Sequence, residues 1–150
     1  MKNNNNLFKL LGSCFIGILS IVIIVLFNKF IPKVAPLLYI LIPFSIFFGY
    51  VLLKGNISKK ILIIMIIISI IYFLLTSLVI IPIADMYEVH IPLTINNFSF
   101  IYKTSETRNA ILNNTFVALV FNIIGNVIAF VIGYSDIKKN NIEFFDPDLD

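Results

Sequence analysis

Four apolar runs without a charged residue dominate this sequence. They cover residues 10–27, 34–53, 61–83 and 110–134, and each is 18 to 25 residues long. A helix rises ~1.5 Å per residue, so about 20 apolar residues cross a hydrocarbon core of ~30 Å. Because backbone polar groups must be paired inside lipid, each run is predicted to form a helix. The sequence therefore predicts an all-α membrane protein with four transmembrane helices.

The composition excludes the main alternatives to a membrane protein. Hydrophobic residues make up 59% of the 150 residues and charged residues only 13%, against about 45–50% and about 25% in soluble domains. These values exclude a soluble globular enzyme and also a disordered chain, which needs low hydrophobicity and high charge. The basic residues lie at the predicted membrane edges. Their charge indicates contact with anionic lipid rather than with nucleic acid.

The loops and their lysines predict the topology. The first two connections, residues 28–33 and 54–60, are short, so the helices should form an antiparallel bundle. Seven Lys and Arg residues fall on the side of both termini and four on the other side, which predicts that both termini are cytoplasmic. Lys outnumbers Arg ten to one, which we interpret as the codon bias of an AT-rich bacterium. We expect one integral domain over residues 1–150 of a bacterial plasma membrane, with a cytoplasmic tail at 135–150.

Small and polar residues define the faces on which the helices should pack. Helix association in lipid depends on close backbone approach or on interhelical hydrogen bonds. Such residues recur at steps of three or four in the fourth run, which places them on one side of a helix. The predicted packing residues are Ser13, Gly17 and Ser20 in the first run, Ser45 and Gly49 in the second, Ser69 and Thr76 in the third, and Ala118, Asn122, Gly125, Asn126, Ala129 and Gly133 in the fourth.

Asn122 and Asn126 are the most polar residues inside the predicted membrane. An unpaired amide in lipid costs several kcal/mol, so both side chains should face protein or water. They form either an interhelical clamp or the polar lining of a solute path. No Asp, Glu, Lys, Arg or His lies in the four runs, which argues against a proton relay or an ion-coupled carrier. Pro43 removes the helical bond to the Tyr39 carbonyl and should kink the second helix.

The loop over residues 84–109 is too long for a simple connector. Apolar and polar residues alternate from Tyr87 to Lys103 around Asn96 and Asn97. This pattern predicts a β-hairpin with one apolar face that needs a covering partner. The residues predicted to form this outer recognition loop are Tyr87, Glu88, His90, Phe98, Phe100 and Tyr102.

The sequence contains little that indicates catalysis. Asp85, Glu88 and His90 offer three ligand types within six residues but lack the spacing of a known metal site. We interpret them as a solvated loop face. The chain has one histidine and one cysteine, which leaves little for a Ser-His-Asp or Cys-His mechanism, and it has no glycine-rich phosphate loop. We therefore expect no catalytic residues, no cofactor and no bound metal.

Two functions stay open. A membrane enzyme that uses Asp85, Glu88 and His90 is a third hypothesis, which the sequence supports least. In the first, the chain is a non-enzymatic accessory protein whose outer loop binds a membrane partner or an incoming toxin, as a small immunity protein does. In the second, it is a subunit of an oligomeric small-solute transporter or channel that uses Asn122, Asn126 and Pro43. The expected partners are the lipid bilayer and either another membrane protein or further copies of this chain.

Overall fold

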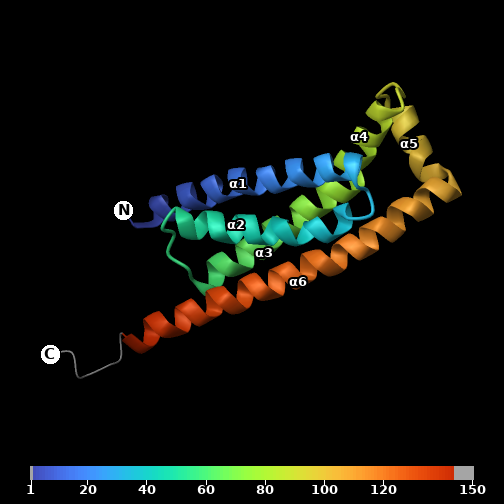
Figure 1. Cartoon of the computed structure of the whole chain (residues 1–150). Helices are drawn as coiled ribbons and strands as arrows, with labels where there is room; N and C mark the ends of the chain where they lie inside the picture. The colour runs from blue at the N-terminus through green and yellow to red at the C-terminus, as the bar shows by residue number, and fades with distance from the viewer. Residues whose placement is uncertain (1, 144–150) are drawn as a thin grey trace.

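The computed structural model describes residues 2–143 of the chain and the side chains of residues 6–138. Within this range the chain forms helices and connecting turns, and Figure 1 shows their arrangement. The α-helices are α1 (Lys2–Phe30), α2 (Leu41–Leu52), α3 (Lys59–Leu75), α4 (Ile81–Glu88), α5 (Ile95–Lys103) and α6 (Ser105–Glu143). A 3₁₀ helix, η1 (Ala35–Ile40), leads into α2, and a π-helix, η2 (Thr76–Ile80), joins α3 to α4.

Four helical stretches are long and apolar enough to cross a membrane. They are Asn6–Phe30, Ala35–Leu52, Lys59–Glu88 and Ser105–Lys138. Three of them contain a predicted apolar run, and the second coincides with its run to within one residue at each end. The second combines η1 with α2, and the third combines α3, η2 and α4. The length and composition of these helices confirm the prediction of a multi-pass membrane protein with four helical spans.

The spans run in alternating directions and lie side by side (Figure 1). α1 packs most closely on α2, and α6 crosses η1, α2 and α3 along the whole bundle. The start of α1 and the end of α6 lie at one end of the bundle, whereas α4 and α5 extend from the opposite end. Residues 84–104 are called the α4–α5 segment below.

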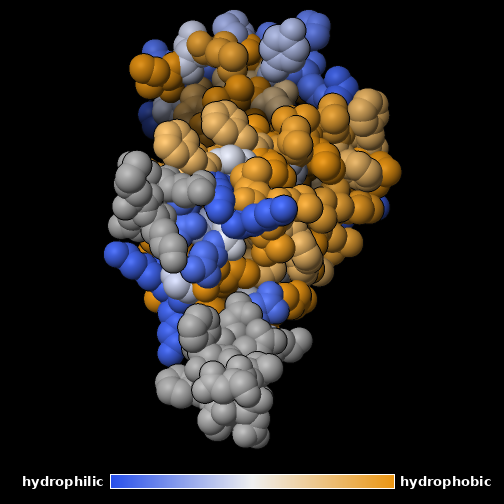
Figure 2. Space-filling view, turned by 90° about the vertical axis from the view of Figure 1, so that its left-hand side faces the viewer, coloured by the Kyte–Doolittle hydropathy of each residue, from blue (hydrophilic) through white to orange (hydrophobic). Residues whose placement is uncertain are grey.

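The sides of the bundle are covered with apolar side chains. Phe15 on α1, Ile67 on α3 and Val131 on α6 are all exposed. Figure 2 looks onto the end where α1 begins, and it shows hydrophilic residues gathered near this end beside a broad apolar surface. Lipid accepts such a surface without a protein partner, whereas water does not.

Glycines allow α1 and α2 to approach each other closely. A Cβ atom at Gly49 would lie 3.2 Å from the Cα of Ser13, and one at Gly17 would lie 2.9 Å from Ile46 Cγ1. Across the same contact the Ser45 hydroxyl donates to Ser20 Oγ at 3.2 Å. This is the close backbone approach on which helix association in lipid depends.

Of the three prolines inside the spans, Pro36 lies at the start of η1, and the other two lie in the first turn of a new α-helical segment. Pro43 is the third residue of α2, directly after η1, and Pro82 is the second residue of α4, directly after η2. Proline is tolerated there because the first N–H groups of a helix have no partner within the helix. The break expected at Pro43 takes the form of this change from 3₁₀ to α-helix.

The predicted β-hairpin in the α4–α5 segment is wrong. α4 continues to Glu88 and ends in a Schellman turn, in which the His90 and Ile91 N–H groups donate to the carbonyls of Tyr87 and Met86. His90 has a φ of 58°, the left-handed conformation that this turn requires. The chain is therefore not extended at His90, where the predicted first strand would run.

The residues of the predicted second strand form α5. Thr94 has the extended conformation of an N-cap, and its hydroxyl accepts a hydrogen bond from the Asn97 N–H at 3.2 Å. The Asn97 side chain also donates to the Pro92 carbonyl at 2.9 Å. Asn96 and Asn97 thus lie in the first turn of a helix rather than in a hairpin turn, because the threonine before them caps that helix.

Candidate functional site

The buried polar residues of α6 meet the break between η1 and α2. Pro43 has no N–H, so the Tyr39 carbonyl cannot receive the α-helical bond from the residue four positions later and instead accepts a backbone N–H at the end of the 3₁₀ helix η1. The Asn122 amide donates to this carbonyl at 3.5 Å and to Ser69 Oγ at 3.3 Å. Asn122 is only 1% exposed. One side chain of α6 therefore links the proline junction with α3.

Asn126 extends this contact by one helical turn. Its amide lies 3.1 Å from Ser69 Oγ and 3.0 Å from Asn122 Oδ1, and it also donates to the Asn122 carbonyl at 2.9 Å. Both amides are thus bound to protein groups on α3, η1 and α6. We call Tyr39, Ser69, Asn122 and Asn126 the asparagine clamp.

Small residues of α6 allow this helix to approach η1, α2 and α3 closely enough for the asparagine clamp to form. A Cβ atom at Gly125 would lie 2.9 Å from the Ile40 carbonyl oxygen and 2.6 Å from Pro43 Cγ, and one at Gly133 would lie 2.6 Å from Leu62 Cδ2. Ala118 and Ala129, on the same side of α6, are buried. The space left beside Asn126 is a cavity of about 10 Å³, which is about the room that one water molecule needs.

A second proline junction has the same arrangement. Pro82 cannot donate to the Leu78 carbonyl, and the Tyr102 hydroxyl of α5 donates to this carbonyl instead. Burial raises the pKa of the Tyr102 phenol above its usual range, which keeps the donor proton in place. Phe98 packs against Tyr102 with ring centroids 5.5 Å apart. The hydrogen bond from Tyr102 to the Leu78 carbonyl joins α5 to the π-helix η2.

The other residues predicted for the recognition loop are spread over the α4–α5 segment. Tyr87 and Phe100 are exposed by 76% and 66%, and Phe98 is half-buried. Glu88 forms an ion pair with Lys29 at 3.2 Å. His90 is exposed in the turn after α4. Tyr102 faces the bundle, so it supports the segment rather than belonging to its free surface.

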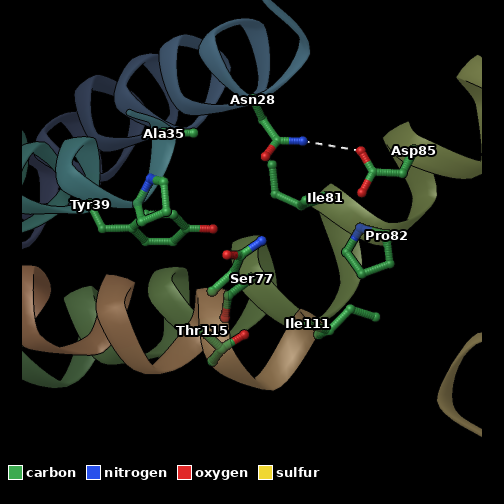
Figure 3. A pocket seen from close by; sticks show the side chains of 11 residues that line it. Asn28, Ala35, Tyr39, Ser77, Ile81, Pro82, Asp85, Ile111 and Thr115 are labelled. Atoms are coloured by element: carbon green, nitrogen blue, oxygen red, sulfur yellow. Dashed lines mark hydrogen bonds between the residues drawn. The ribbon is translucent and has the colours of Figure 1, made fainter. Parts of the chain in front are cut away.

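A polar cavity lies between η1, α4 and α6 near the α4–α5 end (Figure 3). Its volume is about 60 Å³. Tyr39, Ser77 and Asp85 line it together with Asn28, which donates to Asp85 Oδ1 at 3.0 Å. The remaining lining residues are Ala35, Pro36, Ile81, Pro82, Ile111, Asn114 and Thr115.

Asp85, Glu88 and His90 do not assemble as ligands. Among residues 6–138 no group of three or more His, Cys, Asp or Glu side chains is placed to hold a metal ion. Asp85 instead joins the polar cavity, and Glu88 pairs with Lys29. No protein-family model matches the sequence, and no curated protein or solved structure shows significant similarity to it.

Sequence reasoning missed three contributions to these sites. Tyr39 was considered only as the carbonyl that Pro43 leaves without a partner, and Tyr102 only as part of a strand face. Ser69 was expected to pack, but not to join both asparagines. The prolines give a usable signal for the acceptors alone, because Pro43 and Pro82 mark the carbonyls of Tyr39 and Leu78 as groups that lose their usual donor, whereas no such signal points to Ser69 or Tyr102.

Proposed function

We propose that this chain is a non-enzymatic accessory protein of a bacterial plasma membrane. It acts by binding another membrane protein or an incoming toxin through the α4–α5 segment, in the manner of a small immunity protein. The observation that carries the proposal is the apolar exposure of this segment. Ile95 is 89% exposed and Tyr87 is 76% exposed, although both lie at or beyond the end of a span.

Two grooves beside α4 support this assignment. One measures about 370 Å³, lies between α1 and α4, and is lined by Val25, Leu26, Tyr87 and Leu93 among others. The other measures about 340 Å³ and is lined by Met86, Val89, Phe100 and Ile101 on α4 and α5 together with residues of α6. Apolar grooves next to exposed aromatic side chains are suited to the apolar anchor residues of a protein partner.

The lysine distribution supports an outward-facing α4–α5 segment. Lys9, Lys54 and Lys59 lie near the end where α1 begins, which favours a cytoplasmic position for that end by the positive-inside rule. The α4–α5 segment would then face the outside of the cytoplasmic membrane, where an incoming toxin or the external domain of a partner is accessible.

Site-specific photo-crosslinking in native membranes tests the proposal. A photoreactive residue at Ile95 or Phe100 should give an adduct with one and the same partner protein. A photoreactive residue at Ile67, exposed on the side of α3, serves as the matched control and should give lipid adducts. The double substitution Ile95→Asn with Phe100→Asn should abolish the adduct formed by a photoreactive residue at position 87. If the partner is a toxin, the same substitutions should also abolish protection of the cell against it. Lipid adducts at all of these positions would contradict the proposal.

The alternative function is that of a subunit of an oligomeric solute transporter or channel. One observation favours it. The carbonyl of Tyr39 accepts a hydrogen bond from Asn122, and Tyr39 also lines the polar cavity, so the two polar regions of the bundle are adjacent. Asn122→Leu combined with Asn126→Leu should then abolish solute flux in a chain that still folds. Crosslinks between copies of this chain together with lost flux support this alternative, whereas unchanged flux removes it.

A further inference from the structure

We propose that the polar cavity between η1, α4 and α6 binds a primary ammonium group. The combination that carries this inference is the hydroxyl of Tyr39, which opens onto the cavity and has no hydrogen-bond partner among the described residues, a carboxylate with an available oxygen, and a space of about 60 Å³ between them. The inference does not depend on the proposed function, because it concerns the Asp85 carboxylate at this cavity and not the apolar side chains that a protein partner would contact, although Asp85 also borders both grooves.

Tyr39 supplies the first observation. Its side chain is 4% exposed, and its ring is held by an edge-on contact with Phe73 at 5.6 Å between centroids. The hydroxyl points into the cavity (Figure 3), and none of the hydrogen bonds among residues 6–138 involves it. No fully buried side-chain oxygen of the described residues lacks a partner, so this hydroxyl is open to the cavity, and its hydrogen-bond partner has to come from a group inside it.

Asp85 supplies the charge. Asn28 donates to Oδ1 of this carboxylate at 3.0 Å, which orients the group at the cavity wall (Figure 3). Oδ2 stays available as an acceptor on the described part of the chain. The other ionisable groups nearby, Lys29 and Glu88, pair with each other at 3.2 Å and do not line the cavity.

The lining selects a cation that donates hydrogen bonds. It contains one carboxylate and no Lys, Arg or His, so an anion would meet a negative charge with no cation to compensate for it. The Tyr39, Ser77 and Asp85 oxygens can all accept hydrogen bonds, and an ammonium group has three donors and no acceptor. A volume of about 60 Å³ exceeds the ~10–15 Å³ that one water needs, which leaves room for a small amine.

Two sources can supply this group, namely the headgroup of an ethanolamine lipid and a free primary amine. The cavity lies at the end of the spans, between Asn28 at the end of α1 and Asp85 near the end of α4. Lipid headgroups occur at this depth. The bound ammonium group is the same in both cases, so its chemistry does not distinguish the two sources. A separate measurement with lipids, given below, does so.

The test measures thermal unfolding of the full chain in an amine-free detergent by circular dichroism. Methylammonium chloride should raise the Tm in a concentration-dependent manner, because a ligand that binds only the folded state stabilises it. Tetramethylammonium chloride at equal ionic strength has the same charge but no N–H donor, and it should not raise the Tm. Asp85→Asn should abolish the methylammonium effect. Tyr39→Phe should weaken binding about fivefold, the equivalent of one hydrogen bond.

Glu88→Gln is the matched control, because Glu88 is the neighbouring acid outside the cavity, and it should keep the full response to methylammonium. Native mass spectrometry with equal amounts of ethanolamine and choline lipids then identifies the source. Selective retention of the ethanolamine lipid, lost in Asp85→Asn, assigns the lipid headgroup, and equal retention assigns a free amine. Equal stabilisation by the two ammonium ions, or no stabilisation by either, overturns the proposal. Tyr39→Phe keeps the test decisive if Asp85→Asn fails to fold.

Discussion

The side chain of Asn122 on α6 donates at 3.5 Å to the carbonyl oxygen of Tyr39, which has lost the bond from residue 43 to proline and keeps a backbone N–H donor at the end of η1. Tyr102 and Leu78 repeat this relationship at Pro82. In both cases a proline breaks the hydrogen-bonding pattern of a span, and a side chain from a later helix donates to the carbonyl concerned. Such replacement allows prolines inside membrane helices.

Removal of the Tyr102 hydroxyl should weaken the second junction. Tyr102→Phe leaves the ring in place but removes the donor to the Leu78 carbonyl, so we expect the free energy of unfolding to fall by about 1 kcal/mol. Steric trapping in bicelles measures this change. In a Pro82→Ala background the residue at position 82 regains an N–H, so the loss caused by Tyr102→Phe should become smaller. Equal losses in both backgrounds would show that the hydroxyl does not act through this carbonyl.

Replacement of Asn122 should cost more than replacement of Asn126. Asn122→Leu keeps a similar volume but removes the donor to both Tyr39 and Ser69, and we expect a loss of about 1–2 kcal/mol in the free energy of unfolding. Asn126→Leu leaves the Tyr39 carbonyl paired and should cost about half as much. Unfolding titrations of the two variants in the same detergent compare them directly, and the reverse order would contradict the clamp.

An alanine at Gly125 should separate α6 from the η1–α2 junction. The new Cβ would lie 2.9 Å from the Ile40 carbonyl oxygen, a backbone atom that cannot turn aside. Overpacking of this kind costs about 1–3 kcal/mol. Gly12→Ala is the control, because its closest contact is the flexible end of the Leu53 side chain at 2.6 Å. A Tm that falls for Gly125→Ala and stays nearly constant for Gly12→Ala is the expected result.

Glycine at position 90 should stabilise the protein. His90 has a φ of 58° after the end of α4, a conformation that costs a non-glycine residue about 1–2 kcal/mol. We therefore expect His90→Gly to raise the free energy of unfolding by up to about 1 kcal/mol. His90→Ala retains the β-carbon and should give no such gain. A loss of stability in His90→Gly would indicate that the imidazole makes a stabilising contact.

The spans could be predicted from the sequence because a long charge-free run requires a helix whatever its neighbours are. The α4–α5 segment could not be predicted in the same way, because its pattern is ambiguous. Phe98, Phe100 and Tyr102 alternate as in a strand, but Phe98 and Tyr102 are also four residues apart and stack on one side of α5. The cap at Thr94 favours the helix, and such a local contact outweighs a short alternation.

The polar sites could be predicted only in part. The stripe on α6 follows from the spacing of its residues, and Pro43 identifies the carbonyl of Tyr39 as a group in need of a donor. The identity of the donor depends on how α6 crosses η1, which brings together residues 83 positions apart. The polar cavity likewise combines Tyr39, Asp85 and Asn114 from three separate helical elements, and no local pattern links them.

The proline junctions have a consequence for the order in which the chain is assembled in the membrane. Both donors, Tyr102 and Asn122, are translated after the spans whose carbonyls they serve. The first three spans are therefore made before the side-chain donors to the Tyr39 and Leu78 carbonyls exist. We therefore expect the last third of the chain to complete the packing of the first three spans, and a chain truncated before residue 102 should be less stable in the membrane than the full chain.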